Sequence, residues 1–274
     1  MHTRERLVEM CTAAIQSRRL SSGTAAKMRG LATWMDAALA GRCLRAAGHA
    51  LTARQYWDQC EEVTEGSNLW ESLLYIAAAA QWMPDRCISL VRPVAPPVRV
   101  YTDASADADR VRLGAKVLLP DGCTLVTVLD ADQPLRETWG PQDTVINQAE
   151  LQCGTLVAAT FAEELRGHDV IWRVDNTSAA TSLVKAGSPT ATMCRLALQA
   201  SALLAALGCR CWFEHVPSAD NPADVLSRDA LDDPTVASML AGGFWIFRQP
   251  VLPAPFSRLT YQQLWCWTGD NELA

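Results

Sequence analysis

The chain has 274 residues, of which 49% are hydrophobic and 20% are charged, and its mean hydropathy is close to zero. This composition is typical of a globular protein with a substantial core. The longest nearly unbroken apolar stretch, residues 73–83, is too short to span a bilayer. The charged N-terminus is not followed by the apolar run of a secretory signal. These features exclude membrane-spanning and secreted classes, and we expect an intracellular protein.

The charge is distributed unevenly along the chain. The net charge is −6, but residues 1–54 hold nine Lys or Arg against three Asp or Glu, a net of +6. The acidic remainder would repel a phosphate backbone unless metal ions or a basic neighbour offset it. The basic N-terminal stretch is one candidate for that neighbour, and a solvated helix face is an equally good interpretation.

The ten cysteines are scattered along the sequence. They form no Cys-x-x-Cys pair, and with only four histidines the chain lacks zinc-ligand spacing. We therefore interpret them as reduced, buried thiols that act as small hydrophobic residues.

The first 90 residues are predicted to be helical because their apolar residues recur at helical spacing. Ser21 or Ser22 can cap the second helix, and Gly41 can end it. Pro93, Pro96 and Pro97 then predict a linker over residues 91–97 and a domain boundary there. The expected helices cover residues 4–18, 24–40 and 69–83.

After the linker, the pattern changes to an α/β order. A hairpin of antiparallel strands comes first, and helical crossovers that require parallel pairing follow. The expected strands are residues 98–103, 113–119, 123–129, 169–174 and 209–215, and the expected helices are residues 146–166, 177–185, 189–207 and 222–228. This unit covers residues 98–230. Residues 231–274 form a C-terminal tail of unknown role, in which segment 242–247 could pack back on the body.

Four carboxylates occupy informative positions in this unit. Asp103 ends the first strand, where turn chemistry is the ordinary explanation. Glu150 shares a helix face with Cys153 and Val157, where burial of a carboxylate is costly unless a cation meets it. The ordinary explanation for Glu150 is a wet acid near a helix start, stabilised by the helix dipole.

The other two acids are placed in the second half of the unit. Asp175 follows the fourth strand, at the end of a parallel sheet where ligands gather, although it could be the N-cap of the next helix. Asp224 could be an ordinary first-turn acid of a helix that Asn221 caps, with Pro222 at its first position. The sequence leaves open whether Asp220 substitutes for Asp224.

Four acids on four elements suit a two-metal site for phosphodiester hydrolysis, in which the ions activate water and stabilise the leaving oxygen. Mg²⁺ prefers such oxygen ligands, and Mn²⁺ can substitute for it. In this hypothesis Asp103 bridges two ions. Glu150 and Asp175 hold one ion, and Asp224 completes the other.

Four segments that carry these acids resemble the ribonuclease H domain of retrotransposon reverse transcriptases. They are Tyr-Thr-Asp-Ala-Ser (101–105), Asn-Gln-Ala-Glu-Leu (147–151), Val-Asp-Asn-Thr-Ser-Ala (174–179) and residues 215–228, with the specific ending Asn-Pro-Ala-Asp-x-Leu-Ser-Arg. The resemblance implies a ribonuclease H-like five-stranded mixed sheet, in the order 3-2-1-4-5, flanked by helices. It also implies cleavage of the RNA strand of RNA/DNA hybrids, leaving 3′-hydroxyl and 5′-phosphate ends.

The N-terminal part is more loosely similar to the helical segment that joins polymerase to ribonuclease H in such elements, at residues 20–23, 27–31 and 41–42. Because no Tyr-x-Asp-Asp motif occurs, the chain resembles a C-terminal fragment of the polyprotein that lacks the polymerase palm. The polymerase part is therefore an expected partner, and we predict no DNA synthesis by this chain alone.

Two departures from the family pattern bear on activity. Many family members carry a histidine in the loop after the fifth strand, which is thought to help product release, but this loop has none, and His215 before it is interpreted as a strand residue. Arg195 is the only charge between Gly187 and Gly208, where some family members carry a basic protrusion. Activity could therefore be slow or depend on the polymerase part.

Substrate contacts are expected through RNA 2′-hydroxyls and groove shape. Asn176, Gln148 and Ser105 flank the acids and are the candidate substrate-binding residues, although capping or solvent-facing roles fit Asn176 and Gln148 equally well. Two alternatives to hybrid cleavage remain. One is a catalytically inactive ribonuclease H-fold module that binds nucleic acid or serves structurally. The other is an integrase-type nuclease, whose last acid on a long helix fits residues 221–228 poorly.

Overall fold

The computed structural model describes residues 3–38, 43–82, 96–107, 109–140, 145–188, 190–228 and 233–253. Most of the linker predicted at residues 91–97 lies outside these ranges. No helix within them is long and apolar enough to cross a membrane.

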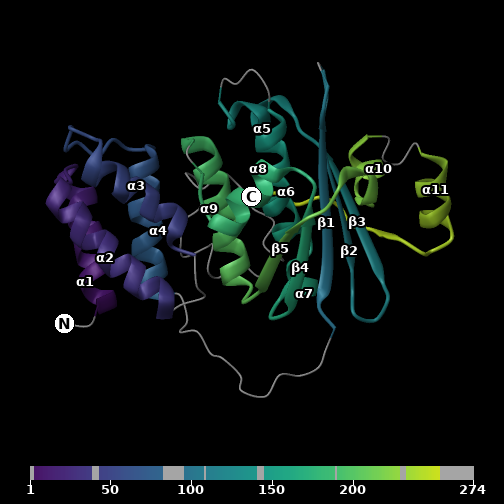
Figure 1. The fold of residues 1–274 in the computed structure, drawn as a ribbon, viewed down its shortest axis with the longest axis horizontal. Coiled ribbons are helices and arrows are strands. Elements are labelled where there is room, and N and C mark those ends of the chain that lie inside the picture. Colours follow the sequence, from purple (N-terminus) through teal and green to yellow (C-terminus); the bar gives the residue numbers. More distant parts are fainter. Residues whose placement is uncertain are drawn as a thin grey trace.

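The N-terminal part is helical, as the sequence predicts, and its helices pack against one another (Figure 1). Three of them match the predicted helices within two residues at each described end. The helix between the second and the last was not predicted separately, because alanines rather than large apolar residues form most of its buried face. The bounds are α1 Thr3–Ser17, α2 Ser22–Ala38, α3 Arg45–Tyr56 and α4 Asn68–Trp82.

The following part is built on a mixed sheet in the order β5-β4-β1-β2-β3-β6. The first three strands pair antiparallel, and β4 and β5 extend the sheet in parallel. The predicted order 3-2-1-4-5 is confirmed, but the predicted number of five strands is wrong, because part of the tail adds a strand parallel to β3. The bounds are β1 Val98–Ala106, β2 Val111–Leu118, β3 Thr124–Asp130, β4 Asp169–Val174, β5 Arg210–His215 and β6 Ile246–Phe247.

The helices cover both faces of this sheet. In Figure 1, α6, α8 and α9 lie on one face, and α10 and α11 lie on the other. The main core fills the first side, and a smaller cluster around Val126, Leu226 and Val236 fills the second. The bounds are α5 Gln133–Glu137, α6 Ile146–Thr160, α7 Ala162–Leu165, α8 Thr177–Lys185, α9 Ala191–Ala206, α10 Asp224–Arg228 and α11 Pro234–Ala241.

Several predicted boundaries were wrong for identifiable reasons. β1 continues beyond Asp103 to Ala106, because β2 pairs with it as far as Val111 opposite Ala106. The predicted helix over residues 146–166 is interrupted at Phe161, which is fully buried and has non-helical backbone angles of φ −113° and ψ 32°. A short helix, α5, lies between β3 and α6, where no helix or strand was predicted.

The helical N-terminal part lies directly against the sheet-containing part, with α3 against α9 (Figure 1). At this contact the His49 ring lies close to Gly187, where a Cβ atom would be 2.4 Å from the ring. Buried residues of both parts belong to one continuous hydrophobic cluster. The two parts therefore share a core.

Candidate metal site

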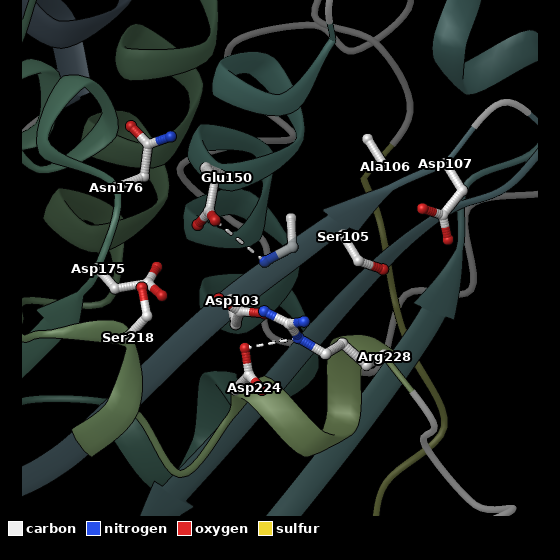
Figure 2. A pocket seen from close by; sticks show the side chains of 11 residues that line it. Asp103, Ser105, Ala106, Asp107, Glu150, Asp175, Asn176, Ser218, Asp224 and Arg228 are labelled. Carbon is white, nitrogen blue, oxygen red and sulfur yellow. Dashed lines mark hydrogen bonds and ion pairs between the residues drawn. The ribbon is translucent and has the colours of Figure 1, made fainter.

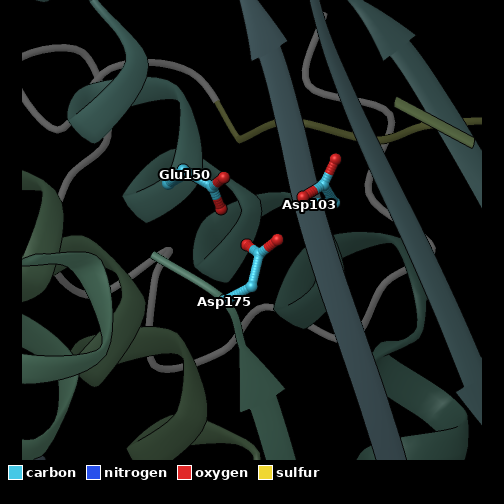
Figure 3. A group of neighbouring side chains, drawn as sticks. All are labelled: Asp103, Glu150 and Asp175. Carbon is cyan, nitrogen blue, oxygen red and sulfur yellow. The ribbon is translucent and has the colours of Figure 1, made fainter. Parts of the chain in front are cut away.

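Three carboxylates from separate elements meet beside the central strands β1 and β4. Asp103 comes from β1, Glu150 from α6, and Asp175 from the residue after β4. One carboxylate oxygen from each lies within 4.8 Å of the other two. Figure 3 shows the three side chains turned toward one another.

Glu150 is the most constrained of these acids, with 4% of its surface exposed. Its Oε1 accepts a hydrogen bond of 3.2 Å from the backbone N–H of Ala104, whereas its Oε2 is buried without a hydrogen-bond partner. Burial, and next the negative charges of Asp103 and Asp175, raises the pKa of Glu150 to about 9. The burial that the sequence predicts for this side chain is therefore observed.

Asp103 is also buried, at 4% exposure. Its Oδ2 accepts a hydrogen bond from the Ser227 hydroxyl. Burial raises the pKa of Asp103 to about 7, and the nearby Asp175 and Asp224 contribute in the same direction, while the Ser227 hydrogen bond opposes the rise. Without a cation, the site disfavours its own negative charge.

Asp175 is not the N-cap of α8. Asn176 has that role, because its Oδ1 accepts a hydrogen bond of 2.9 Å from the N–H of Ala179. The Asp175 carboxylate therefore remains directed to the acidic cluster. His215, at the end of β5, contacts the backbone of Asp175, with Nε2 3.0 Å from the Asp175 carbonyl oxygen.

Asp224 begins α10 and faces the same cavity from the other side. Its Oδ1 accepts a hydrogen bond of 2.8 Å from Nε of Arg228, one turn later on that helix (Figure 2). Asp224 lines the cavity, whereas Asp220, in the short 3₁₀ helix η1 (Ser218–Asp220), does not. The expected helix start at Pro222 was wrong, because residues 222 and 223 form a turn and the helix begins at Asp224. Asn221 still accepts a hydrogen bond at Oδ1 from the Ala223 N–H, and its Nδ2 donates to the Thr102 carbonyl oxygen.

The cavity in front of the acids has a volume of about 570 Å³. Figure 2 shows the side chains around it. Sequence reasoning missed Asp107, Ser218 and Arg228 among its lining residues. The sequence carried a signal for Asp107, because every second residue of an extended chain lies on the same face, and Asp107 follows Asp103 and Ser105 at that spacing. The lining residues are Asp103, Ala104, Ser105, Ala106, Asp107, Glu150, Asp175, Asn176, Ser218, Asp224 and Arg228.

The three predicted substrate-binding residues have different positions. Ser105 and Asn176 line the cavity, but Asn176 also donates from Nδ2 to Asn147 at 3.0 Å, and Ser105 donates to the Ser227 carbonyl oxygen at 2.6 Å. Gln148 is 5% exposed and is not one of the described residues that line the cavity. Of the three, only Ser105 and Asn176 have a place where substrate could reach them.

The arrangement suits a divalent metal ion. The available donors are carboxylate oxygens, the ligands that hard divalent cations prefer. The buried Oε2 of Glu150 has no other partner, and burial together with neighbouring like charges raises the pKa values of Glu150 and Asp103. A bound cation would supply the missing partner and remove the repulsion.

Two solved structures resemble part of this chain. One is ribonuclease H1 from the halophilic archaeon Halobacterium salinarum NRC-1, with 24% identity and a TM-score of 0.38 over 50% of this chain and 98% of that one. The other is the N-terminal ribonuclease H domain of Rv2228c from Mycobacterium tuberculosis, fused to maltose-binding protein. It has 18% identity and a TM-score of 0.38, over 52% of this chain and 97% of that one. No family model and no curated protein matches the sequence.

The strand order and the helices on both faces of the sheet define the fold class. The sheet-containing part has an α/β, ribonuclease H-like fold, with β1 at the centre and an acidic cluster where β1 and β4 meet α6.

Proposed function

We propose that this chain is a two-metal-ion endonuclease that hydrolyses the RNA strand of RNA/DNA hybrids, as part of a retroelement reverse transcriptase. The observation that carries the proposal is the convergence of Asp103, Glu150 and Asp175 at an open cavity, with one oxygen of Glu150 buried and unpartnered. A purely structural acid would not be expected to keep such an oxygen.

In this proposal, Glu150 and Asp175 would hold one Mg²⁺, Asp224 would hold a second, and Asp103 would be a ligand of both. When bound, the ions would supply an activated water and charge stabilisation at the leaving oxygen. Mn²⁺, which accepts the same oxygen donors, would substitute. Asp103 and Glu150 are buried, and they accept hydrogen bonds from the Ser227 hydroxyl and the Ala104 N–H, respectively.

The substrate would approach from the open side of the cavity. Ser105 and Asn176 line the cavity and would contact the hybrid there, and Arg228, whose side chain is 64% exposed, would meet a phosphate. Recognition through 2′-hydroxyls and groove shape would make cleavage independent of base sequence.

The retroelement assignment is supported by residues 215–228, whose sequence ending is the most specific part of the resemblance. It implies that the polymerase part of the same polyprotein is a partner. Addition of that part is expected to increase the cleavage rate of this chain.

The first test is cleavage of a hybrid whose RNA strand is end-labelled. With Mg²⁺ or Mn²⁺, the chain is expected to cut the hybrid, to leave single-stranded RNA intact, and to lose at least about 100-fold in rate in Asp103→Asn, because a ligand of both ions is neutralised. Glu163→Gln, an exposed acid on α7, is the matched control and should keep full activity. Folded protein that binds the hybrid but cuts it with neither metal would instead support the inactive module.

A further inference from the structure

Two buried polar side chains connect the loop and helix that carry Asp224 to the strand that carries Asp103. Asn221, 5% exposed, donates from Nδ2 to the Thr102 carbonyl oxygen at 3.0 Å and accepts at Oδ1 from the Ala223 N–H at 3.2 Å. Ser227, with no exposed surface, donates from Oγ to Asp103. Both bonds to β1 join residues about 120 positions apart in the sequence.

Ser227 contacts both acid-bearing residues. Its Oγ lies 2.9 Å from the Asp224 carbonyl oxygen as well as beside Oδ2 of Asp103. The Ser105 hydroxyl donates to the Ser227 carbonyl at 2.6 Å and adds a third bond between β1 and residues 221–228. The Asp103 oxygen beside Ser227 is thereby fixed, which sets the direction in which the other oxygen points.

Glycine 114 makes this approach possible. It pairs opposite Asp103 in the sheet, and a Cβ atom there would lie 2.8 Å from both the Leu226 Cβ and the Ser227 nitrogen. The backbone of α10 therefore rests directly on β2 beside Asp103. This close packing brings the Ser227 hydroxyl within reach of a carboxylate on the neighbouring strand.

We propose that Ser227 and Asn221 are positioning residues of the acidic site. Ser227 orients the Asp103 carboxylate, and Asn221 holds the start of α10, so that Asp103 and Asp224 face one cavity before a metal ion binds. This inference rests on the proposed function for the identity of the ligand, a divalent cation. It gives Asn221 and Ser227 an orienting role, which differs from the metal-binding role proposed for Asp224 in the same segment.

The test is metal binding by the full chain without nucleic acid, measured by isothermal titration calorimetry with Mn²⁺. Loss of a side chain that orients a metal ligand typically weakens affinity by roughly 10- to 100-fold. Ser227→Ala is expected to show a loss of that size, and Ser227→Thr, which keeps the hydroxyl, is expected to recover most of it. Asn221→Ala is expected to weaken binding through Asp224 and provides an independent test if Ser227→Ala does not fold.

The matched control is Ser182→Ala on α8. Ser182 is also buried, at 4% exposure, but its hydroxyl bonds within its own helix, to the Ser178 carbonyl oxygen at 2.8 Å. This variant should lower the melting temperature slightly and leave Mn²⁺ affinity unchanged. Unchanged affinity in folded Ser227→Ala or Asn221→Ala overturns the inference. No Mn²⁺ binding by the unmodified chain overturns the proposed function instead.

Discussion

Glu150 is held in its neutral form at neutral pH in the metal-free protein, because burial raises its pKa to about 9. Asp103, whose pKa is raised to about 7, is affected in the same direction. An acid with a raised pKa keeps a proton in the folded state that the unfolded chain has already released, so its contribution to stability is lost as pH rises. Glu150 and Asp103, the candidate metal ligands, therefore make the metal-free protein less stable at alkaline pH.

We predict that the free energy of unfolding of the metal-free protein falls between about pH 4.5 and pH 9, the ordinary and raised pKa values of Glu150. Glu150→Gln removes the ionisable group, so it should flatten this slope and raise the melting temperature at pH 8 by several degrees. Thermal melts in a chelator at several pH values would measure both effects. A melting temperature in Glu150→Gln that declines as steeply as in the unmodified chain would contradict the prediction.

The same melts with Mg²⁺ added give a second check on this residue. Because the metal binds the deprotonated carboxylates, protons compete with it, and the stabilisation should be larger at pH 8 than at pH 5. Stabilisation that does not depend on pH would place the ion away from Glu150 and Asp103.

At the scale of elements, the short helix α10 depends on close packing rather than on its own length. It has five residues, too few to be stable alone, and it lies against β1, β2 and β3. The backbone of α10 packs so closely on Gly114 of β2 that no side chain would fit at this position.

We predict that Gly114→Ala destabilises the protein by roughly 1–3 kcal/mol, because backbone atoms of α10 would have to move. The matched control is Gly48→Ala in the middle of α3, where a Cβ atom meets nothing within 4 Å. That substitution should stabilise the protein by about 0.5–1 kcal/mol. Denaturant unfolding curves would compare the two, and a neutral Gly114→Ala would show that α10 is not held at this contact.

The elements that carry the four acids were predictable because periodicity and turn residues mark them locally. The side chains that orient the acids were not. The local bond of Asn221 to the Ala223 N–H fits the expected cap, but its second bond, to the Thr102 carbonyl oxygen, has no local signal. The contacts of Ser227 and Gly114 have none either. Such contacts join β1 or β2 to α10 across more than a hundred residues, so they exist only once the sheet has formed.

At the scale of the whole molecule, the helical part and the sheet share one core, through α3, α9 and the contact of His49 with Gly187. The domain boundary near residue 97 therefore stays a prediction. Because the two parts share a core, this boundary does not imply that each part folds on its own.

We predict that differential scanning calorimetry of the full chain gives a single transition, with equal calorimetric and van't Hoff enthalpies, because the two parts are stabilised by the same buried contacts. Two resolved transitions would show that residues 1–97 unfold separately.

The strand β6 covers part of an edge of the sheet that the predicted unit, ending at residue 230, would leave open. It pairs with Leu125 and Val126 of β3, and Arg248 adds a bond to the Val126 carbonyl oxygen. Open strand edges pair readily with other chains. Shortening the chain at residue 230 would thus uncover unpaired backbone groups and the apolar cluster around Val126, and aggregation of the shortened protein could then be mistaken for a lack of nuclease activity.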